Sequence, residues 1–205
     1  MAEGPCLKDT VELIEKERAY GGYLAIDRFR LTHGKFEGGR TPPITREVMA
    51  RGEVVGLLPY DPRADQVVLI EQFRIGAYAA GVWAWLTEIV AGVMAPGETA
   101  EEVARRETLE ETGLRPARIA PIGYYLMSPG CSTEAMHLFC GEVDSPSAGG
   151  IHGLDDEAED IRVFSLPFEE AVKLVASGAL TNFPIVIALQ WLIINRDALR
   201  RRWAA

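Results

Sequence analysis

The sequence predicts a mixed α/β or α+β sandwich that carries a small antiparallel β-sheet at its N-terminal end. Short alternating segments fill residues 1–50, whereas stronger strand and helix patterns follow without the regular repetition of a parallel βαβ array. A chain of 205 residues suits one full domain with a small appendage. We therefore expect residues 1–50 to form a separate sheet region and residues 51–205 to form the main domain.

Three alternating segments predict the N-terminal sheet: VELIEKERAY, YLAIDRFRLTH and ITREVMA. Glycine and proline pairs, which are typical of turns, punctuate these segments: Gly21-Gly22, Gly38-Gly39 and Pro42-Pro43. Three stronger strands are expected next, in EVVGLLPYD, DQVVLIEQFRIG and VWAWLTEIVAG.

The pattern becomes helical from Thr99 to Thr112, where Thr99 and Glu102 form a capping box and Gly113 supplies a C-terminal stop. Two strands are expected around IGYYLM and AMHLFCGEV, followed by a glycine-rich and acidic loop over residues 147–160. IRVFSL predicts another strand, PFEEAVKLVAS a helix ended by Gly178, and FPIVIALQWLIINRDALRRRW a long C-terminal helix.

The composition excludes several classes of protein. A formal net charge of -9 opposes binding to nucleic acid or to an anionic membrane. Cys6, Cys131 and Cys140 form no CxxC pair, which indicates a reducing compartment and neither a disulfide framework nor a zinc site. The start lacks a signal-peptide pattern, and the longest apolar region, residues 185–194, is about half a membrane span. We therefore expect a soluble, cytoplasmic protein.

The helix over residues 99–112 carries the chemistry. At about 100° per residue, one broad face contains six side chains: Ala100, Val103, Ala104, Glu107, Thr108 and Glu111. A glutamate-rich helix is ordinarily a solvated, salt-bridged surface. Here two carboxylates share a face with small core residues, so they lose hydration and repel each other unless cations compensate. Mg²⁺ prefers such oxygen ligands, and it keeps substrate phosphates and water in its remaining positions.

The segment from Gly92 to Leu114, GVMAPGETAEEVARRETLEETGL, resembles the Nudix box. That motif is a Gly, five residues, Glu, seven residues, Arg-Glu, an aliphatic residue, any residue, Glu-Glu, any residue, Gly and an aliphatic residue. Eight positions match in identity and spacing: Gly92, Glu98, Arg106, Glu107, Glu110, Glu111, Gly113 and Leu114. Thr108 stands where an aliphatic residue is usual, a departure that affects packing and not metal ligation.

The resemblance implies an α/β/α Nudix sandwich with a mixed sheet, and a hydrolase that uses Mg²⁺, or Mn²⁺, to cut a pyrophosphate. Glu107 and Glu111 would be the principal metal ligands, together with the backbone carbonyl of Ala91. Glu110 would support them or ligate, and Glu98 and Arg106 would hold the loop and helix in place. Bound cations would also let an acidic protein bind an anionic substrate, by neutralising charge at phosphorus.

A second motif narrows the resemblance. Pro129 lies sixteen residues beyond Gly113, within the segment SPGCSTE, which resembles the SPG-containing loop of ADP-ribose pyrophosphatases. Taken alone, Ser128-Pro129-Gly130 is a turn signature. The similarity to this subfamily continues through LLPYDPRADQVVLIEQFRIGAY, GIHGLDDEAEDIRV and VIALQWL, so it covers most of the chain.

The subfamily resemblance implies a set of substrate contacts: Tyr23, Arg46, Glu47, Arg51, Arg74, Val93, Ser128, Gly130 and Glu134. Tyr23 would stack on adenine, and arginine suits bidentate recognition of phosphate. Arg46, Glu47 and Arg51 would lie on the same surface. For any one of these residues, ordinary surface charge or aromatic packing is the alternative. Because two chains exchange N-terminal sheets in this subfamily, the resemblance also implies a homodimer.

An acidic loop follows, with five carboxylates: Asp155, Asp156, Glu157, Glu159 and Asp160. Taken alone, it would be a solvated loop. The resemblance places the general base at Glu157 and an additional metal ligand at Glu159, with Asp156 or Glu159 next in line as the base. His33, His137 and His152 are too scattered for a metal or triad motif.

These expectations lead to the hydrolysis of ADP-ribose to AMP and ribose 5-phosphate. The nearest alternative is a pyrophosphatase for another nucleoside diphosphate sugar, such as GDP-mannose. A nucleotide-sensing module without catalysis is a further alternative, but such modules commonly lack box glutamates, and this chain has them all.

Overall fold

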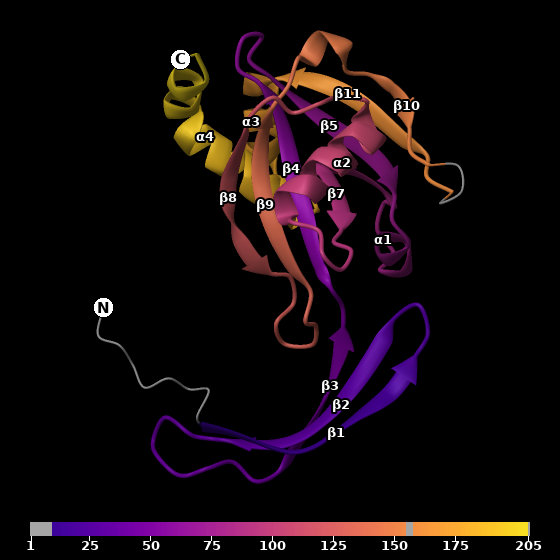
Figure 1. Cartoon of the computed structure of the whole chain (residues 1–205), viewed down its shortest axis with the longest axis vertical. Coiled ribbons are helices and arrows are strands. Elements are labelled where there is room, and N and C mark those ends of the chain that lie inside the picture. Colours follow the sequence, from indigo (N-terminus) through magenta and orange to yellow (C-terminus); the bar gives the residue numbers. More distant parts are fainter. Residues whose placement is uncertain (1–9, 155–157, 205) are drawn as a thin grey trace. The chain divides into compact units, whose positions relative to one another are not determined.

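The computed structural model describes residues 10–154 and 158–204 of the chain, which divide into two compact units (Figure 1). The smaller unit comprises the residues up to Gly52 together with Leu126–Ala135. The larger unit comprises Glu53–Tyr125 and Met136–Ala205. Residues 126–135 connect two strands of the larger unit's sheet, so the smaller unit is not one continuous stretch of sequence.

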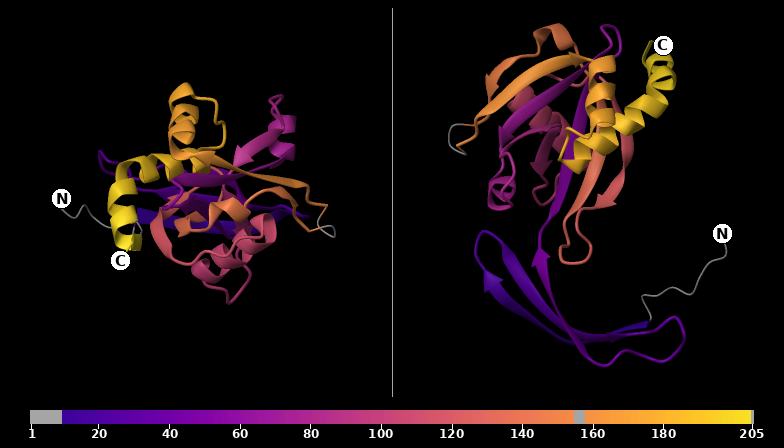
Figure 2. Two further views of the ribbon diagram at one scale, coloured as in Figure 1. Left: turned by 90° about the horizontal axis from the view of Figure 1, so that it is seen from above. Right: turned by 180° about the vertical axis from the view of Figure 1, so that it is seen from behind.

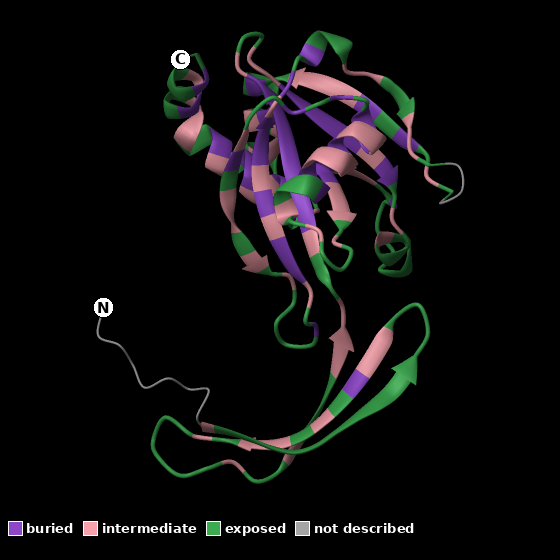
Figure 3. Ribbon diagram, in the orientation of Figure 1, coloured by how far each residue is buried: buried purple, intermediate pink, exposed green. Residues whose placement is uncertain are grey.

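The smaller unit contains the expected antiparallel sheet, with strands in the order β1-β2-β3. The strands are β1 (Val11–Gly21), β2 (Ala25–His33) and β3 (Ile44–Ala50). Asp27 is the one buried residue in these strands, and Lys16 and Arg18 both form ion pairs with it. The green and pink ribbon in Figure 3 shows how little of this sheet is buried in a single chain. The exchange of this sheet between two chains stays a prediction.

The larger unit is built on a sheet of eight strands, ordered β10-β11-β5-β4-β9-β8, with β6 beside β5 and β7 beside β4. The strands are β4 (Glu53–Asp61), β5 (Gln66–Phe73), β6 (Trp85–Glu88), β7 (Val90–Val93), β8 (Ile119–Leu126), β9 (Ala135–Glu142), β10 (Gly150–His152) and β11 (Ile161–Pro167). A 3₁₀ turn, η2 (Ser145–Ser147), follows β9.

Helices cover both faces of this sheet, as the view from above in Figure 2 shows. Helix α2 (Ala100–Thr112) packs on β4 and β7, whereas α3 (Phe168–Ser177) and α4 (Phe183–Ala204) lie on the opposite face. Burial on both faces explains why β4 is continuously buried from Val55 to Asp61 instead of alternating. The predicted α/β/α sandwich with a mixed sheet is therefore confirmed.

The C-terminal helix shows how its sequence produces this packing. Ile185, Ala188, Leu189 and Leu192 are buried at the i, i+3, i+4 and i+7 positions of α4, which is the apolar stripe of a helix facing a core. None of the helices in the described ranges combines the length and the apolar character needed to cross a membrane.

Three expected segments differ from the structure. VWAWLTEIVAG is not one strand, because β6 pairs with β5 and β7 pairs with β4, so the chain changes partner at the buried Ile89. The strand expected in DQVVLIEQFRIG ends at Phe73, since a five-residue helix, α1 (Ile75–Ala79), follows. In addition, β10 forms inside the expected acidic loop by pairing with β11.

Candidate active site

Helix α2 begins and ends where its local sequence predicts. Thr99 Oγ1 accepts a hydrogen bond from the Glu102 amide at 3.3 Å, and a Glu102 carboxylate oxygen accepts one from the Thr99 amide at 2.8 Å. Gly113 closes the helix with φ 71°, a left-handed conformation that favours glycine, and its amide donates to the Leu109 carbonyl. These caps fix where the helix begins and ends, and therefore where its glutamates lie along the helix.

Most of the expected face of α2 is buried, with Ala100 and Glu107 partly buried. Val103, Ala104, Thr108 and Glu111 are all inaccessible or nearly so, with Glu111 at 3% exposed. Thr108 is the residue that departs from the family motif. Its hydroxyl donates to the Ala104 carbonyl at 2.6 Å, so this polar side chain satisfies its hydrogen bond within the helix and tolerates full burial.

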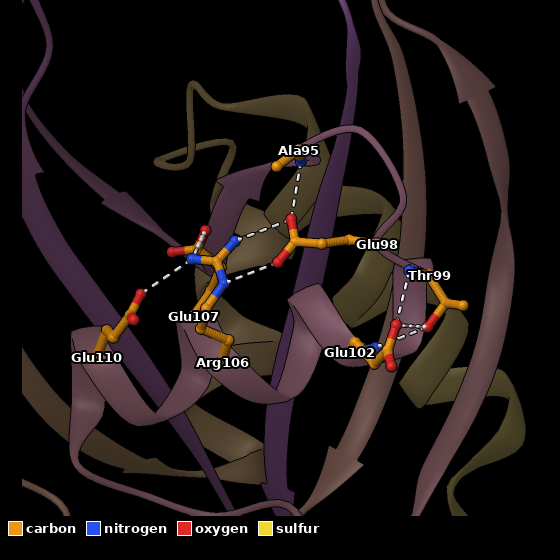
Figure 4. A network of polar contacts seen from close by, with 7 residues as sticks. All are labelled: Ala95, Glu98, Thr99, Glu102, Arg106, Glu107 and Glu110. Carbon is orange, nitrogen blue, oxygen red and sulfur yellow. Dashed lines mark hydrogen bonds and ion pairs between the residues drawn. The ribbon is translucent and has the colours of Figure 1, made fainter.

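Arg106 connects the glutamates of the motif (Figure 4). Its guanidinium lies 3.2 Å from a Glu98 oxygen, 2.7 Å from a Glu107 oxygen and 3.0 Å from a Glu110 oxygen. Glu98 also accepts a hydrogen bond from the Ala95 amide at 2.8 Å, which ties the preceding loop to the helix. One cation therefore orders three carboxylates that would otherwise repel one another.

Gly92 is required by the position of Glu107. A Cβ atom at residue 92 would lie 1.8 Å from Glu107 Oε1 and 1.9 Å from its Cδ. No positive φ is involved, so the requirement for glycine is steric and not conformational. The glycine lets the Glu107 carboxylate rest directly against the backbone of β7.

Glu111 lies beside the same strand. One of its oxygens accepts a hydrogen bond from the Ala91 amide at 3.2 Å. Burial raises the pKa of the Glu111 carboxyl to about 8, with the Ala91 amide and Arg74 opposing the rise and the charges of Glu107 and Glu159 adding to it. A negative charge here needs a compensating positive charge.

Glu107 and Glu159 belong to the same electrostatic cluster. Burial also raises the pKa of Glu107, against the effect of Arg106 and with contributions from Glu110 and Glu159. Glu159 is held by its own loop, since its carboxylate accepts from the Leu154 amide at 3.3 Å and its amide donates to the Leu154 carbonyl at 3.2 Å. The expected base Glu157, with Asp155 and Asp156, lies outside the described residues.

The donor set fits a hard divalent cation. Carboxylate oxygens gather against the exposed peptide backbone of β7, with no described cysteine or histidine among them. Within residues 10–154 and 158–204, no three His, Cys, Asp or Glu side chains are arranged to hold a metal ion. Arg106 contacts one oxygen each of Glu107 and Glu110, and the Ala91 amide contacts one of Glu111, so the second oxygen of each carboxylate is left for a cation.

Arg74 acts electrostatically on this cluster, and Glu88 holds its guanidinium in place. Its Nε and Nη2 atoms donate to Glu88 Oε2 at 3.0 and 2.7 Å, and its charge lowers the pKa of Glu111. Glu88 is 3% exposed and also accepts from Asn182, at the start of α4. The sequence contained no motif for Glu88 or Asn182, because the contacting residues are far apart in the chain. Val93, another expected substrate contact, is exposed at the end of β7.

The smaller unit brings together three other expected substrate contacts. Arg51 Nε donates to Glu134 Oε2 at 3.0 Å, and its guanidinium lies 5.7 Å from the centre of the Tyr23 ring. The Thr133 hydroxyl accepts a hydrogen bond from the Arg51 amide and donates one to the Arg51 carbonyl. The Tyr23 ring is 91% exposed, so one face is available for stacking.

The remaining expected contacts do not share one surface. Arg46 and Glu47 are consecutive on β3, so their side chains project to opposite faces of the small sheet. Glu47 accepts from Arg28 at 2.8 Å, whereas Arg46 donates to the Thr45 carbonyl. Ser128-Pro129-Gly130 forms a turn, in which the Ser128 carbonyl accepts from the amides of Cys131 and Ser132.

Comparison with known proteins agrees with this geometry. The NUDIX domain model matches residues 50–187. The chain is 46% identical to the ADP-ribose pyrophosphatase of Escherichia coli (strain K12) over 96% of this chain and 94% of that protein. It is 38% identical to the ADP-ribose pyrophosphatase of Haemophilus influenzae, over 94% of this chain and 90% of that one.

More distant relatives extend the comparison. The chain is 31% identical to the GDP-mannose pyrophosphatase of Pectobacterium atrosepticum, over 92% of this chain and 97% of that protein. A crystal structure described as an ADP compounds hydrolase superposes with a TM-score of 0.72 at 20% identity, over 94% of this chain and 96% of that one, which shows a shared fold. Together with the matching motif on α2, these relationships establish that the chain belongs to the Nudix hydrolase family.

Proposed function

We propose that this protein hydrolyses the pyrophosphate bond of ADP-ribose to AMP and ribose 5-phosphate with Mg²⁺, or alternatively Mn²⁺. The observation that carries the proposal is the pair of the partly buried Glu107 and the buried Glu111, which lie against the backbone of Gly92 and Ala91. Such a pair supports metal-dependent phosphate chemistry. The substrate follows from the 46% identity to ADP-ribose pyrophosphatases along nearly the whole chain.

Each residue of the cluster has a proposed role. Glu107, Glu111, Glu159 and the carbonyl of Ala91 would hold the cations, with Glu110 supporting. When bound, the cations supply charge neutralisation at the diphosphate and acidify a water molecule. Arg106, held by Glu98, sets the resting positions of Glu107 and Glu110.

The proton from the attacking water would pass to Glu157, with Asp156 or Glu159 as the alternative base. Glu159 supports this role, because its charge acts on Glu107 and Glu111 and it lies two residues from Glu157 in the sequence. A base carried on a loop can approach the water when substrate is bound, which limits side reactions.

Each unit carries some of the proposed substrate contacts. In the larger unit, Arg74 offers a guanidinium held by Glu88 for the diphosphate, and Val93 flanks the cluster on β7. In the smaller unit, Tyr23 offers an exposed ring for adenine, and Arg51 and Glu134 offer polar contacts beside it. The remaining proposed contacts are Arg46, Glu47, Ser128 and Gly130. Pro129 shapes the turn that contains Ser128 and Gly130.

A homodimer with exchanged N-terminal sheets is part of the proposal. Support comes from the sheet itself, whose strand β1 exposes the apolar side chains of Val11, Leu13 and Ile14 in a single chain. Exposed apolar surface of this kind is typical of a surface that contacts another chain. We also propose a cytoplasmic location, which the free thiols of Cys131 and Cys140 fit.

GDP-mannose is the second candidate substrate, because a relative at 31% identity bears the name GDP-mannose pyrophosphatase. A nucleotide-sensing role without catalysis is disfavoured, since every glutamate of the motif is present.

A product-resolved screen tests these alternatives. ADP-ribose, GDP-mannose and other nucleoside diphosphate sugars would be incubated with the purified chain and Mg²⁺, Mn²⁺ or EDTA, and products separated by chromatography. We expect AMP from ADP-ribose with either ion and none with EDTA. Preferred cleavage of GDP-mannose would overturn the substrate assignment. Binding of ADP-ribose without turnover in saturating Mg²⁺ would instead favour the sensing module.

A further inference from the structure

A cavity lies in the larger unit at the C-terminal end of α4. It shares no residue with the Nudix motif. Its volume is about 660 Å³, within the range of small-molecule sites. Its walls include Arg63, Arg118, Glu142, Arg200, Arg201 and Trp203. These residues come from the β4–β5 turn, the start of β8, the end of β9 and the last turns of α4.

The cavity is basic although the chain as a whole carries a net charge of -9. Its lining contains four arginines and one carboxylate, that of Glu142. Arg118 neutralises this carboxylate with two bonds, Nε to Oε2 at 2.6 Å and Nη2 to Oε1 at 3.2 Å, and also donates to the Trp203 carbonyl. Glu142 therefore presents no uncompensated negative charge to a ligand.

The other three arginines keep donors available. In the part of the chain that the structure describes, the side chains of Arg63 and Arg201 have no hydrogen bond or ion pair. Arg200 approaches Asp65 at 3.7 Å, but the Asp65 carboxylate is already bound by Arg196 and by the Tyr60 hydroxyl. Two guanidinium groups without partners, and a third whose one ionic contact is long, therefore line the same cavity.

Helix stabilisation explains only part of this arrangement. Arginines in the last turn of α4 favour the negative end of the helix dipole, which accounts for Arg201. It does not account for Arg63 and Arg118, which lie on other segments and line the same cavity. The basic character is local to this cavity, since an adjoining cavity of about 340 Å³ combines Arg63 and Arg115 with three carboxylates, those of Asp61, Glu142 and Asp144.

We propose that this cavity is a second, non-catalytic binding site for a small molecule that carries phosphate. Planar guanidinium groups recognise phosphate oxygens through paired, charge-assisted hydrogen bonds. Two unpaired arginines, Arg63 and Arg201, converge with Arg200 on the fixed Arg118, which suits a diphosphate or the phosphate of a phosphorylated metabolite. The proposal does not depend on which nucleoside diphosphate sugar the Nudix site cleaves.

Calorimetric titration of the full chain in EDTA tests the proposal, because chelation removes the cations on which the Nudix cluster depends. The probes are inorganic pyrophosphate and AMP. We expect one pyrophosphate per chain, with affinity weakened about tenfold or more by the double change Arg63→Gln and Arg201→Gln. If AMP also binds and its affinity also falls in the Arg63→Gln and Arg201→Gln variant, phosphorylated metabolites are ligands of the cavity. If pyrophosphate binds and AMP does not, the ligand is free diphosphate.

Matched variants separate this site from other basic surfaces. Arg30→Gln removes an exposed arginine on β2 and should leave the affinity unchanged. Arg74→Gln removes the arginine that faces the Nudix cluster and should also leave it unchanged. If the double variant melts at a lower temperature, the single Arg63→Gln change repeats the test. The proposal fails if neither probe binds, if the Arg63 variants bind like the parent, or if Arg74→Gln abolishes binding.

Discussion

Replacing Gly92 by alanine should displace Glu107 and remove most activity. The added Cβ would lie 1.8 Å from Glu107 Oε1, whereas ordinary van der Waals contact begins at 3.4 Å. The carboxylate must therefore retreat by 3.4 − 1.8 = 1.6 Å. A misplacement of about 1 Å in a catalytic arrangement can lower a rate by about 10²-fold, so we expect kcat/KM for ADP-ribose to fall by about that factor or more.

The folding cost of this change should be much smaller than its catalytic cost. All three of the nearest atoms belong to the Glu107 side chain, which can rotate away. Rotation breaks the 2.7 Å ion pair between Glu107 and Arg106, a partly exposed contact worth about 1 kcal/mol or less. Urea denaturation of the parent and Gly92→Ala proteins should therefore differ by about 1 kcal/mol in the free energy of unfolding.

Two controls make the test specific to Glu107. Gly21→Ala adds the same methyl group to a sheet residue with no atom within 4 Å, and it should change neither stability nor rate. In a Glu107→Ala background, Gly92→Ala should cost no stability, because the clashing atoms are gone. The reasoning is refuted if Gly92→Ala keeps kcat/KM within threefold of the parent, or if its stability cost persists without Glu107.

Four further substitutions probe separate parts of the structure. Glu88→Gln removes the carboxylate that holds Arg74, so KM for ADP-ribose should rise about tenfold with a smaller change in kcat. Steady-state kinetics of this variant and of Arg74→Gln would show whether both residues act through the Arg74–Glu88 contact. Thr99→Ala removes the N-cap of α2 and should lower the free energy of unfolding by about 1 kcal/mol in urea titrations. Thr181→Ala is the control, because it changes an exposed threonine outside the helices and should leave the free energy of unfolding unchanged. Burial raises the pKa of Asp61, but hydrogen bonds from the amides of Ala64, Ser145 and Arg63 and from the Ser145 hydroxyl outweigh this and bring it below its ordinary value of 3.8. Stability from this carboxylate is present above pH 3.8 and is lost as the pH falls through its lower folded pKa, so Asp61→Asn should flatten the dependence of stability on pH below 3.8. An unchanged slope in that range would contradict the assignment. Glu157→Gln should lower kcat by about 10²-fold with nearly intact binding, and a near-normal kcat would transfer the base role to Asp156 or Glu159.

The motif helix could be predicted from sequence because everything that shapes it is local. Its caps, Thr99 with Glu102 and then Gly113, lie within one turn of its ends. The shared face of Glu107 and Glu111 follows from the helical period alone. Strand pairing is not local, and this explains why VWAWLTEIVAG was predicted as one strand. Its two halves have the same extended pattern, and only their partners, β5 and β4, distinguish them.

Among the candidate site residues, the same division applies. Local spacing marked Gly92 as part of the motif, but only the contact with Glu107 shows that a side chain cannot fit there. The Arg74–Glu88 pair, with Asn182 also bound to Glu88, joins the residue after β5, the end of β6 and the residue before α4, which no sequence pattern connects. The consecutive residues Arg46 and Glu47 appeared as neighbours in sequence, yet the strand directs them to opposite faces.

By itself, the sequence determined the family, because the motif that identifies it lies along a single loop and helix with its own caps. The tertiary structure decided what surrounds them. It buried Glu111 against β7 and raised its pKa to about 8, anchored Arg74 from behind, and assembled a basic cavity from arginines at residues 63, 118, 200 and 201. Burial and long-range contacts arise only when the sheet brings distant segments together, so these features have no local signature.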